Sequence, residues 1–212
     1  MDTQSIKAHL NLSAVLQNLE ELIKLDPQMT DLTRNWNIVI QFAVWNGPAA
    51  YLEFSGGACR HGVGNHANPT VKLLFTSPAH LNRMFDGKGN PIPVKGFAKL
   101  GFMQREFPKL TDRLEYFLKP EAGKVQDDAF ARVNTILSLY TAIYAVKELA
   151  TLEPTCKKVA AATPPGVLQV EVLPDGPQVH LAFDSGSVRV AKGPAAAPTA
   201  KMMFKDMSVA SA

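Results

Sequence analysis

The segment Pro69-Thr70-Val71-Lys72-Leu73-Leu74-Phe75 occurs a second time in this chain as Pro198-Thr199-Ala200-Lys201-Met202-Met203-Phe204. The two segments lie 129 positions apart (69 to 198), and the match extends towards the N-terminus at the same offset without a gap. At this offset the turn Gly47-Pro48 aligns with Gly176-Pro177. The further identical pairs are Leu52 with Leu181, Phe54 with Phe183, Gly57 with Gly186, Arg60 with Arg189 and Gly64 with Gly193. Unrelated hairpins share turn residues but no such common register, so the pattern predicts an internal duplication.

The first copy has the pattern of a helix followed by a sheet. Apolar residues recur at helical spacing from Leu12 to Ile23, and Asp26-Pro27 predicts the end of that helix. Period-two alternation predicts a strand from Asn37 to Trp45, which the Asn46-Gly47-Pro48 turn joins to a second strand. Two further strands are expected at residues 58–63 and 70–75.

Beyond these strands, Ser77-Pro78 predicts the start of a short helix that Gly87 closes. A strand is expected from Gly96 to Met103 and a helix over residues 108–118. A long apolar helix over residues 127–152, begun by Asp127-Asp128, follows, and the alanine- and proline-rich residues 159–166 suggest a linker.

This order of elements, with Asp86-Gly87-Lys88-Gly89-Asn90-Pro91 and Gly96-Phe97-Ala98-Lys99-Leu100, resembles the SCP2-like (sterol carrier protein 2) domain family. The resemblance covers about residues 35–118 in full and 166–212 in part. It implies an α+β fold, with a curved antiparallel sheet covered by helices on one face and a partial second sheet. The implied division is a helical segment (1–34), an SCP2-like domain (35–120), a connecting helix and linker (121–165) and a partial repeat (166–212). Gly89 after Lys88, and Gly96-Phe97 in place of Gly-Lys, depart from the family pattern.

The resemblance implies a non-enzymatic protein that binds or transfers sterols, fatty acids or acyl chains in an apolar cavity, with no cofactor. The candidate lining residues are the inward side chains Phe42, Val44, Leu52, Phe54, Leu73, Phe75, Leu81, Phe85, Leu100 and Phe102. Each of them could instead simply pack the core. Lys72 with Lys201, and Arg60 with Arg189, could neutralise an anionic ligand, or could be solvated surface charges.

Composition narrows the possible partners. The chain has 212 residues, a net charge of +3 and scattered Lys and Arg, which argues against nucleic-acid binding. Two distant cysteines and a non-basic N-terminus predict a cytoplasmic protein, and no transmembrane segment is expected.

Cys59, His61 and His66 could supply zinc ligands, and this loop is the basis for a metal-dependent enzyme as an alternative. The second copy has Val188, Val190 and Ala195 there, so no metal is expected.

A second hypothesis is that the fold has a filled core and serves as an interaction or dimerisation module, with the helix from Phe130 to Val146 as the contact surface. A cavity would favour ligand binding, and a solid core with a large interface would favour the module.

Because the second copy lacks the closing strand, we also expect the natural chain to continue past Ala212, or the tail to complete another molecule's sheet.

Overall fold

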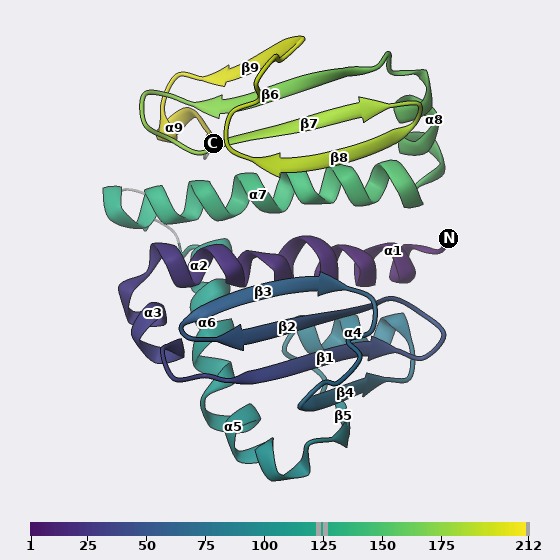
Figure 1. The fold of residues 1–212 in the computed structure, drawn as a ribbon, viewed down its shortest axis with the longest axis vertical. Coiled ribbons are helices and arrows are strands. Elements are labelled where there is room, and N and C mark those ends of the chain that lie inside the picture. The colour runs from purple at the N-terminus through teal and green to yellow at the C-terminus, as the bar shows by residue number, and fades with distance from the viewer. Residues whose placement is uncertain (122–123, 125–126, 211–212) are drawn as a thin grey trace. The chain divides into compact units, whose positions relative to one another are not determined.

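The computed structural model describes residues 1–121, 124 and 127–210 (Figure 1). The chain divides into two compact units, Met1–Tyr116 and Phe117–Ala212. Each unit contains one β-sheet together with helices, so the predicted α+β class is confirmed.

The first unit begins with a continuous helical segment whose hydrogen-bonding pattern changes along its length. It consists of α1 (Thr3–Leu10), the π-helical η1 (Asn11–Val15), the 3-10 turn η2 (Leu16–Asn18) and α2 (Leu19–Leu25). Asp26 follows it, and the Asp26 carboxylate accepts a hydrogen bond from Gln28 N at 2.9 Å, which caps α3 (Pro27–Thr33). The predicted helix with its stop at Asp26-Pro27 is confirmed, and its apolar side chains Leu12, Leu19 and Leu22 are buried.

The sheet of the first unit is mixed. Its strands are β1 (Ile38–Val44), β2 (Ala49–Ser55), β3 (Ala58–Val63), β4 (Val71–Phe75) and β5 (Ile92–Lys95), in the order β3-β2-β1-β4-β5. β1 and β4 are parallel, which corrects the expectation of an antiparallel sheet. The reason is the loop of residues 64–70, which crosses β1 and delivers β4 to the far side of that strand; Gln41 on β1 hydrogen-bonds to Gly64 and His66 of this loop.

The segment after β4 differs in part from the sequence expectation. Helix α4 (Pro78–Phe85) begins as predicted, with the Ser77 hydroxyl accepting a hydrogen bond from His80 N. The predicted strand from Gly96 to Met103 is wrong, because β5 ends at Lys95 and residues 97–105 form η3 (Phe97–Lys99) and α5 (Leu100–Arg105). Gly96 turns the chain with a left-handed φ of +84°, a conformation that favours glycine and cannot continue a strand. Helix α6 (Phe107–Leu118) follows.

The second unit repeats this plan with fewer elements. Its helices are α7 (Asp128–Leu152), α8 (Pro154–Ala162) and α9 (Met207–Ala210), and its strands are β6 (Gly166–Val172), β7 (Gln178–Asp184), β8 (Ser187–Lys192) and β9 (Ala200–Phe204). The Asp127 carboxylate caps α7 as predicted. The proposed linker overlaps α8, which continues to Ala162.

The strand orders of the two sheets agree. The second sheet has the order β8-β7-β6-β9, which matches β3-β2-β1-β4, and β6 and β9 are parallel. Equivalent residues of the two sheets are 129 positions apart from β2 onwards. Tyr51, which pairs with Gln41, corresponds to His180, which pairs with Gln169. The offset between β1 and β6 is instead 128 (41 to 169), because the turn before β7 has one residue more than the turn before β2. The duplication behind this agreement stays a prediction.

Helix α7 is long and apolar enough to cross a membrane by length and composition, with a mean hydropathy of 1.2 over its most apolar stretch. However, 44% of that stretch is buried inside the structure, and the core helix of a water-soluble protein meets the same criterion. The helix is therefore only weak evidence for a membrane span.

Candidate functional site

The ten residues predicted to line a cavity all belong to the first unit. Those on strands β1, β2 and β4 share one face, where Phe42 lies beside Leu73 and Val44 beside Phe75. Seven of the ten side chains are buried, with at most 5% of their surface exposed: Phe42, Val44, Leu52, Phe54, Leu73, Phe75 and Leu81. The other three, Phe85, Leu100 and Phe102, are half-buried.

Two aromatic residues that the sequence analysis missed join this face to the helices. Trp36 lies 5.1 Å from Phe54 and 4.7 Å from Phe102 between ring centroids, in edge-to-face geometry. Phe107 on α6 lies 6.3 Å from Phe42 and 6.5 Å from Phe54. Contacts of this kind stabilise a packed interior. The structure therefore gives most of the predicted lining residues a clear packing role, and their role in ligand binding stays a prediction.

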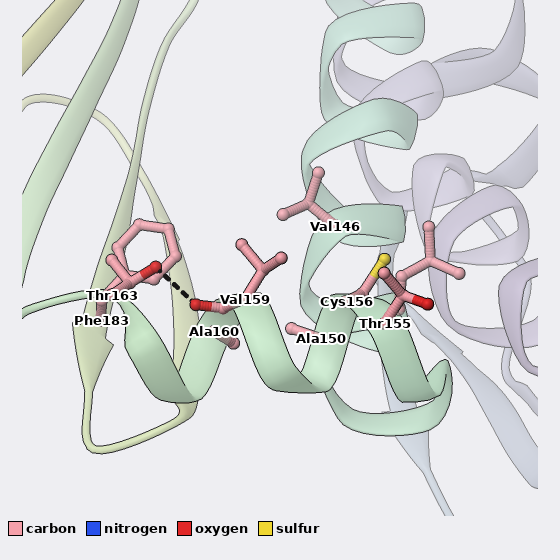
Figure 2. Close-up of a pocket in the computed structure, with 9 residues that line it drawn as sticks. Val146, Ala150, Thr155, Cys156, Val159, Ala160, Thr163 and Phe183 are labelled. Atoms are coloured by element: carbon pink, nitrogen blue, oxygen red, sulfur yellow. Dashed lines mark hydrogen bonds between the residues drawn. The ribbon is translucent and has the colours of Figure 1, made fainter.

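An apolar pocket lies in the second unit (Figure 2). Its volume is about 220 Å³. Helices α7 and α8 and strand β7 form its wall, with the side chains Val146, Leu149, Ala150, Thr155, Cys156, Val159, Ala160, Thr163 and Phe183. None of these nine residues is charged, and six carry only hydrocarbon side chains.

The turn between α7 and α8 positions the pocket. Glu153 ends α7, and its carboxylate caps α8 by accepting a hydrogen bond from Cys156 N at 2.6 Å. Pro154 at the first position of α8 has no N–H to leave unsatisfied there. The small side chains of Ala150 on α7 and Ala160 on α8 are both buried, and residues of this size leave space between packed helices. Alanines in these two helices are the sequence signal that could have indicated the pocket.

The polar groups of the pocket wall are held in neutral form. The Thr163 hydroxyl donates a hydrogen bond to the Val159 carbonyl oxygen at 2.8 Å (Figure 2). A hydrogen bond to the Glu153 carboxylate, together with burial, raises the pKa of the Cys156 thiol. The thiol is therefore protonated at neutral pH, and the wall consists of aliphatic side chains, one aromatic ring, a neutral SH group and the side chains of Thr155 and Thr163.

The basic residues proposed as anion partners are engaged elsewhere or lie apart from this pocket. Arg60 forms an ion pair with Glu53 on the neighbouring strand, and its guanidinium lies over the Tyr51 ring. Lys201 lies 3.8 Å from the Glu171 carboxylate. None of the four predicted basic residues lines the pocket.

The Cys59, His61 and His66 side chains do not come together. Cys59 and His61 pair with Phe54 and Leu52 and so lie on the helix-covered face of the sheet, whereas the His66 ring packs against Tyr51 on the opposite face. His61 Nε2 lies 2.7 Å from the Leu12 carbonyl oxygen. Burial raises the pKa of the Cys59 thiol far above its ordinary value, which disfavours the thiolate that zinc needs. Among the residues that the structure describes, no group of three or more His, Cys, Asp or Glu could hold a metal ion.

Comparisons with known proteins identify no family. No family model matches the chain, and no curated protein matches it. One similar solved structure is the solution structure of a conserved hypothetical protein, possibly a sterol carrier protein, from Thermus thermophilus. It is 18% identical, the match covers 53% of this chain and 90% of that chain, and the TM-score is 0.37. At this level of similarity the match carries no argument about ligand or function.

Proposed function

We propose that this protein is a non-enzymatic binder of lipid-like hydrophobic ligands, and that the pocket between α7, α8 and β7 holds an uncharged apolar part of the ligand. The observation that carries the proposal is the wall of nine uncharged residues around about 220 Å³. Apolar pockets with a few polar groups are typical of small-molecule sites. The two free cysteines, Cys59 and Cys156, suit a reducing compartment such as the cytoplasm, which we include in the proposal.

The volume limits the size of the bound group. Dry apolar cavities of about 150 Å³ accept benzene, and drug-sized ligands occupy about 300–1,000 Å³. A volume of about 220 Å³ lies between them and fits a short alkyl chain, a single ring or the end of a longer acyl chain. Burial of such a group gains about 25 cal/mol per Å² of apolar surface, so we expect dissociation constants of about 0.1–1 mM for isolated short ligands.

The electrostatics favour a neutral ligand over an anion. The Glu153 carboxylate hydrogen-bonds to Cys156, a wall residue, so a ligand carboxylate there would be repelled. None of the nine described lining residues is a cation that could compensate. We therefore expect 1-octanol to bind more tightly than octanoate, although the two chains are of equal length.

Alkylation of Cys156 provides the test. Iodoacetamide should modify Cys156 slowly at neutral pH, because the pKa of its thiol is raised, and Cys59 more slowly still, because burial raises the pKa of the Cys59 thiol far above its ordinary value. Saturating 1-octanol should slow modification of Cys156 in wild type but not in Ala150→Leu, in which the added side chain fills the pocket. Ala142→Leu on the exposed side of α7 is the matched control and should behave like wild type. Equal rates with and without 1-octanol in wild type would contradict the proposal.

The alternative function, an interaction module, has a separate observation in its favour. The rings of Trp36 and Phe107 both contact Phe54 in the interior of the first unit, and the second unit exposes apolar side chains on strand β9. The two functions are compatible, since the exposed strand and the pocket involve different residues.

A further inference from the structure

Strand β9 is exposed where its counterpart in the first unit is covered. Met202 and Met203 on β9 have 50% and 58% of their surface exposed. The equivalent residues on β4 are Leu73, which is 3% exposed, and Leu74, which is half-buried. The two strands occupy the same place relative to β1 and β6, but of the two only β4 has a further described strand on its outer side.

An antiparallel strand covers β4 in the first unit. β5 pairs with it, so that Lys72 faces Lys95 and Leu74 faces Ile92. β9 is the last strand in the order β8-β7-β6-β9, and no described strand of the sheet pairs with its outer side (Figure 1). The first unit thus indicates which kind of element fits this edge, namely a short antiparallel strand.

The β9 edge lacks the proline that helps to protect β5. Edge strands commonly avoid pairing through proline, lysine or bulges. β5 contains Pro93 and ends with Lys95, whereas β9 contains no proline. Its one lysine within the strand, Lys201, lies 3.8 Å from the Glu171 carboxylate on β6, which offsets its charge. The edge is open to pairing, and an exposed edge of this kind is a template for another strand.

The backbone geometry makes β9 complementary to itself. The Phe204 carbonyl oxygen accepts a hydrogen bond from Leu173 N at 2.9 Å, so Phe204 faces β6. Because backbone groups alternate in direction along a strand, Met202 also faces β6, while Lys201 and Met203 direct their N–H and C=O groups to the open edge. Two copies of β9 can then pair antiparallel about Met202, with Lys201 of each copy opposite Met203 of the other. A shift of two residues in either direction would instead place Lys201 opposite Lys201 or Lys205 of the other copy, and like charges directly opposite each other are unfavourable.

We infer that β9 is a homodimer interface, in which the β9 strands of two copies pair antiparallel about Met202 and join the two four-stranded sheets. Such an interface is isologous, as a two-fold axis requires. It places no two lysines directly opposite each other, and it covers the edge-facing main chain of Lys201 and Met203. It does not depend on ligand binding, because no residue of β9 lines the pocket.

Sedimentation of the full chain over a range of concentrations up to about 1 mM tests the inference. Wild type should form a dimer. Met203→Pro removes one edge-facing N–H per copy without removing a hydrogen bond to β6, so it should weaken dimerisation about 100-fold, about tenfold for each lost bond. Met203→Thr keeps the N–H and should dimerise like wild type. A monomer at all concentrations, or a dimer that Met203→Pro leaves intact, would overturn the inference.

Cross-linking tests the register and also applies if Met203→Pro folds poorly. In a Cys59→Ala, Cys156→Ala background, Met202→Cys should form a disulfide-linked dimer on mild oxidation. Residues directly opposite in a non-hydrogen-bonded pair have Cα atoms about 4.5 Å apart, within the range for a disulfide. The matched variant Met203→Cys should cross-link poorly, because its Cα atoms would lie beyond about 7 Å. Efficient cross-linking of Met203→Cys but not of Met202→Cys would overturn the proposed register.

Discussion

The side-chain oxygen of Gln41 accepts a hydrogen bond from the backbone N–H of His66 at 2.6 Å. The Gln41 amide nitrogen donates towards the carbonyl oxygens of Ala50 at 2.9 Å and Gly64 at 3.1 Å, so one buried side chain fixes the loop that crosses β1. Gln169 makes the same contact with Ala195 N, also at 2.6 Å, in the second unit. This glutamine permits the parallel pairing of β1 with β4 and of β6 with β9, because it satisfies the backbone of the crossing loop.

The first prediction concerns this glutamine. Gln41→Met keeps a similar volume but leaves the backbone groups of His66 and Gly64 without this partner in a part-buried place. We expect a loss of about 3 kcal/mol in the free energy of unfolding, because each unsatisfied buried group costs about 1–3 kcal/mol. Urea unfolding measures this loss, and hydrogen exchange at the His66 amide should become faster. A loss below about 1 kcal/mol with unchanged exchange would contradict the assigned role.

The second prediction concerns Gly96, where the predicted strand is replaced by a turn. A Cβ at this position would lie 2.4 Å from the Thr70 carbonyl oxygen, and φ is +84°. Gly96→Ala should therefore destabilise the protein by more than about 2 kcal/mol, since a backbone clash adds to the cost of a left-handed alanine. Gly87 also has a positive φ of +69°, but its added Cβ would meet nothing within 4 Å. Gly87→Ala should cost only about 1 kcal/mol, and equal losses in thermal or urea unfolding would refute the clash argument.

The third prediction is a pH dependence. Burial, and then the Glu20 carboxylate, raise the pKa of the Cys59 thiol in the folded protein, whereas the unfolded thiol titrates near its ordinary value of about 8.5. Below about pH 8.5 the thiol is neutral in both states, and the free energy of unfolding is not reduced. Above about pH 8.5 the thiol ionises in the unfolded state only, so the free energy of unfolding falls by about 1.4 kcal/mol per pH unit. Urea unfolding between about pH 8 and pH 10 should show this slope. Cys59→Ala should have a flatter profile, and parallel profiles for the two proteins would contradict the assignment.

Much of the first sheet could be predicted because it is decided by local patterns. Alternation in β1 and β2 and the turn at Gly47-Pro48 are each set by neighbouring residues. The same holds for the helix caps at Ser77 and, in the second unit, at Asp127. The alternation of residues 96–103 was misleading, since the four residues before Gly96 already complete the sheet as β5. Strand direction could not be predicted either, because it depends on a loop held by Gln41 from another part of the chain.

The alanines of α7 and α8 are only a weak sequence signal for the pocket, for a similar reason. Ala150 and Ala160 are ordinary helix formers in the sequence, and only the packing of α7 on α8 makes them small residues on facing surfaces. The large apolar residues of the first unit favour a cavity there, and that cavity stays a prediction. Trp36 and Phe107, which are distant in sequence, pack against Phe54 on the same covered face.

The most direct test of ligand binding is an NMR measurement of intermolecular NOEs between 1-octanol and the methyl groups of the full chain. We expect NOEs from the alkyl chain to Val146, Val159 and Ala160 in wild type, and their loss in Ala150→Leu. NOEs confined to methyl groups of the first unit, such as those of Leu52 and Leu73, or no NOEs at millimolar 1-octanol, would contradict it.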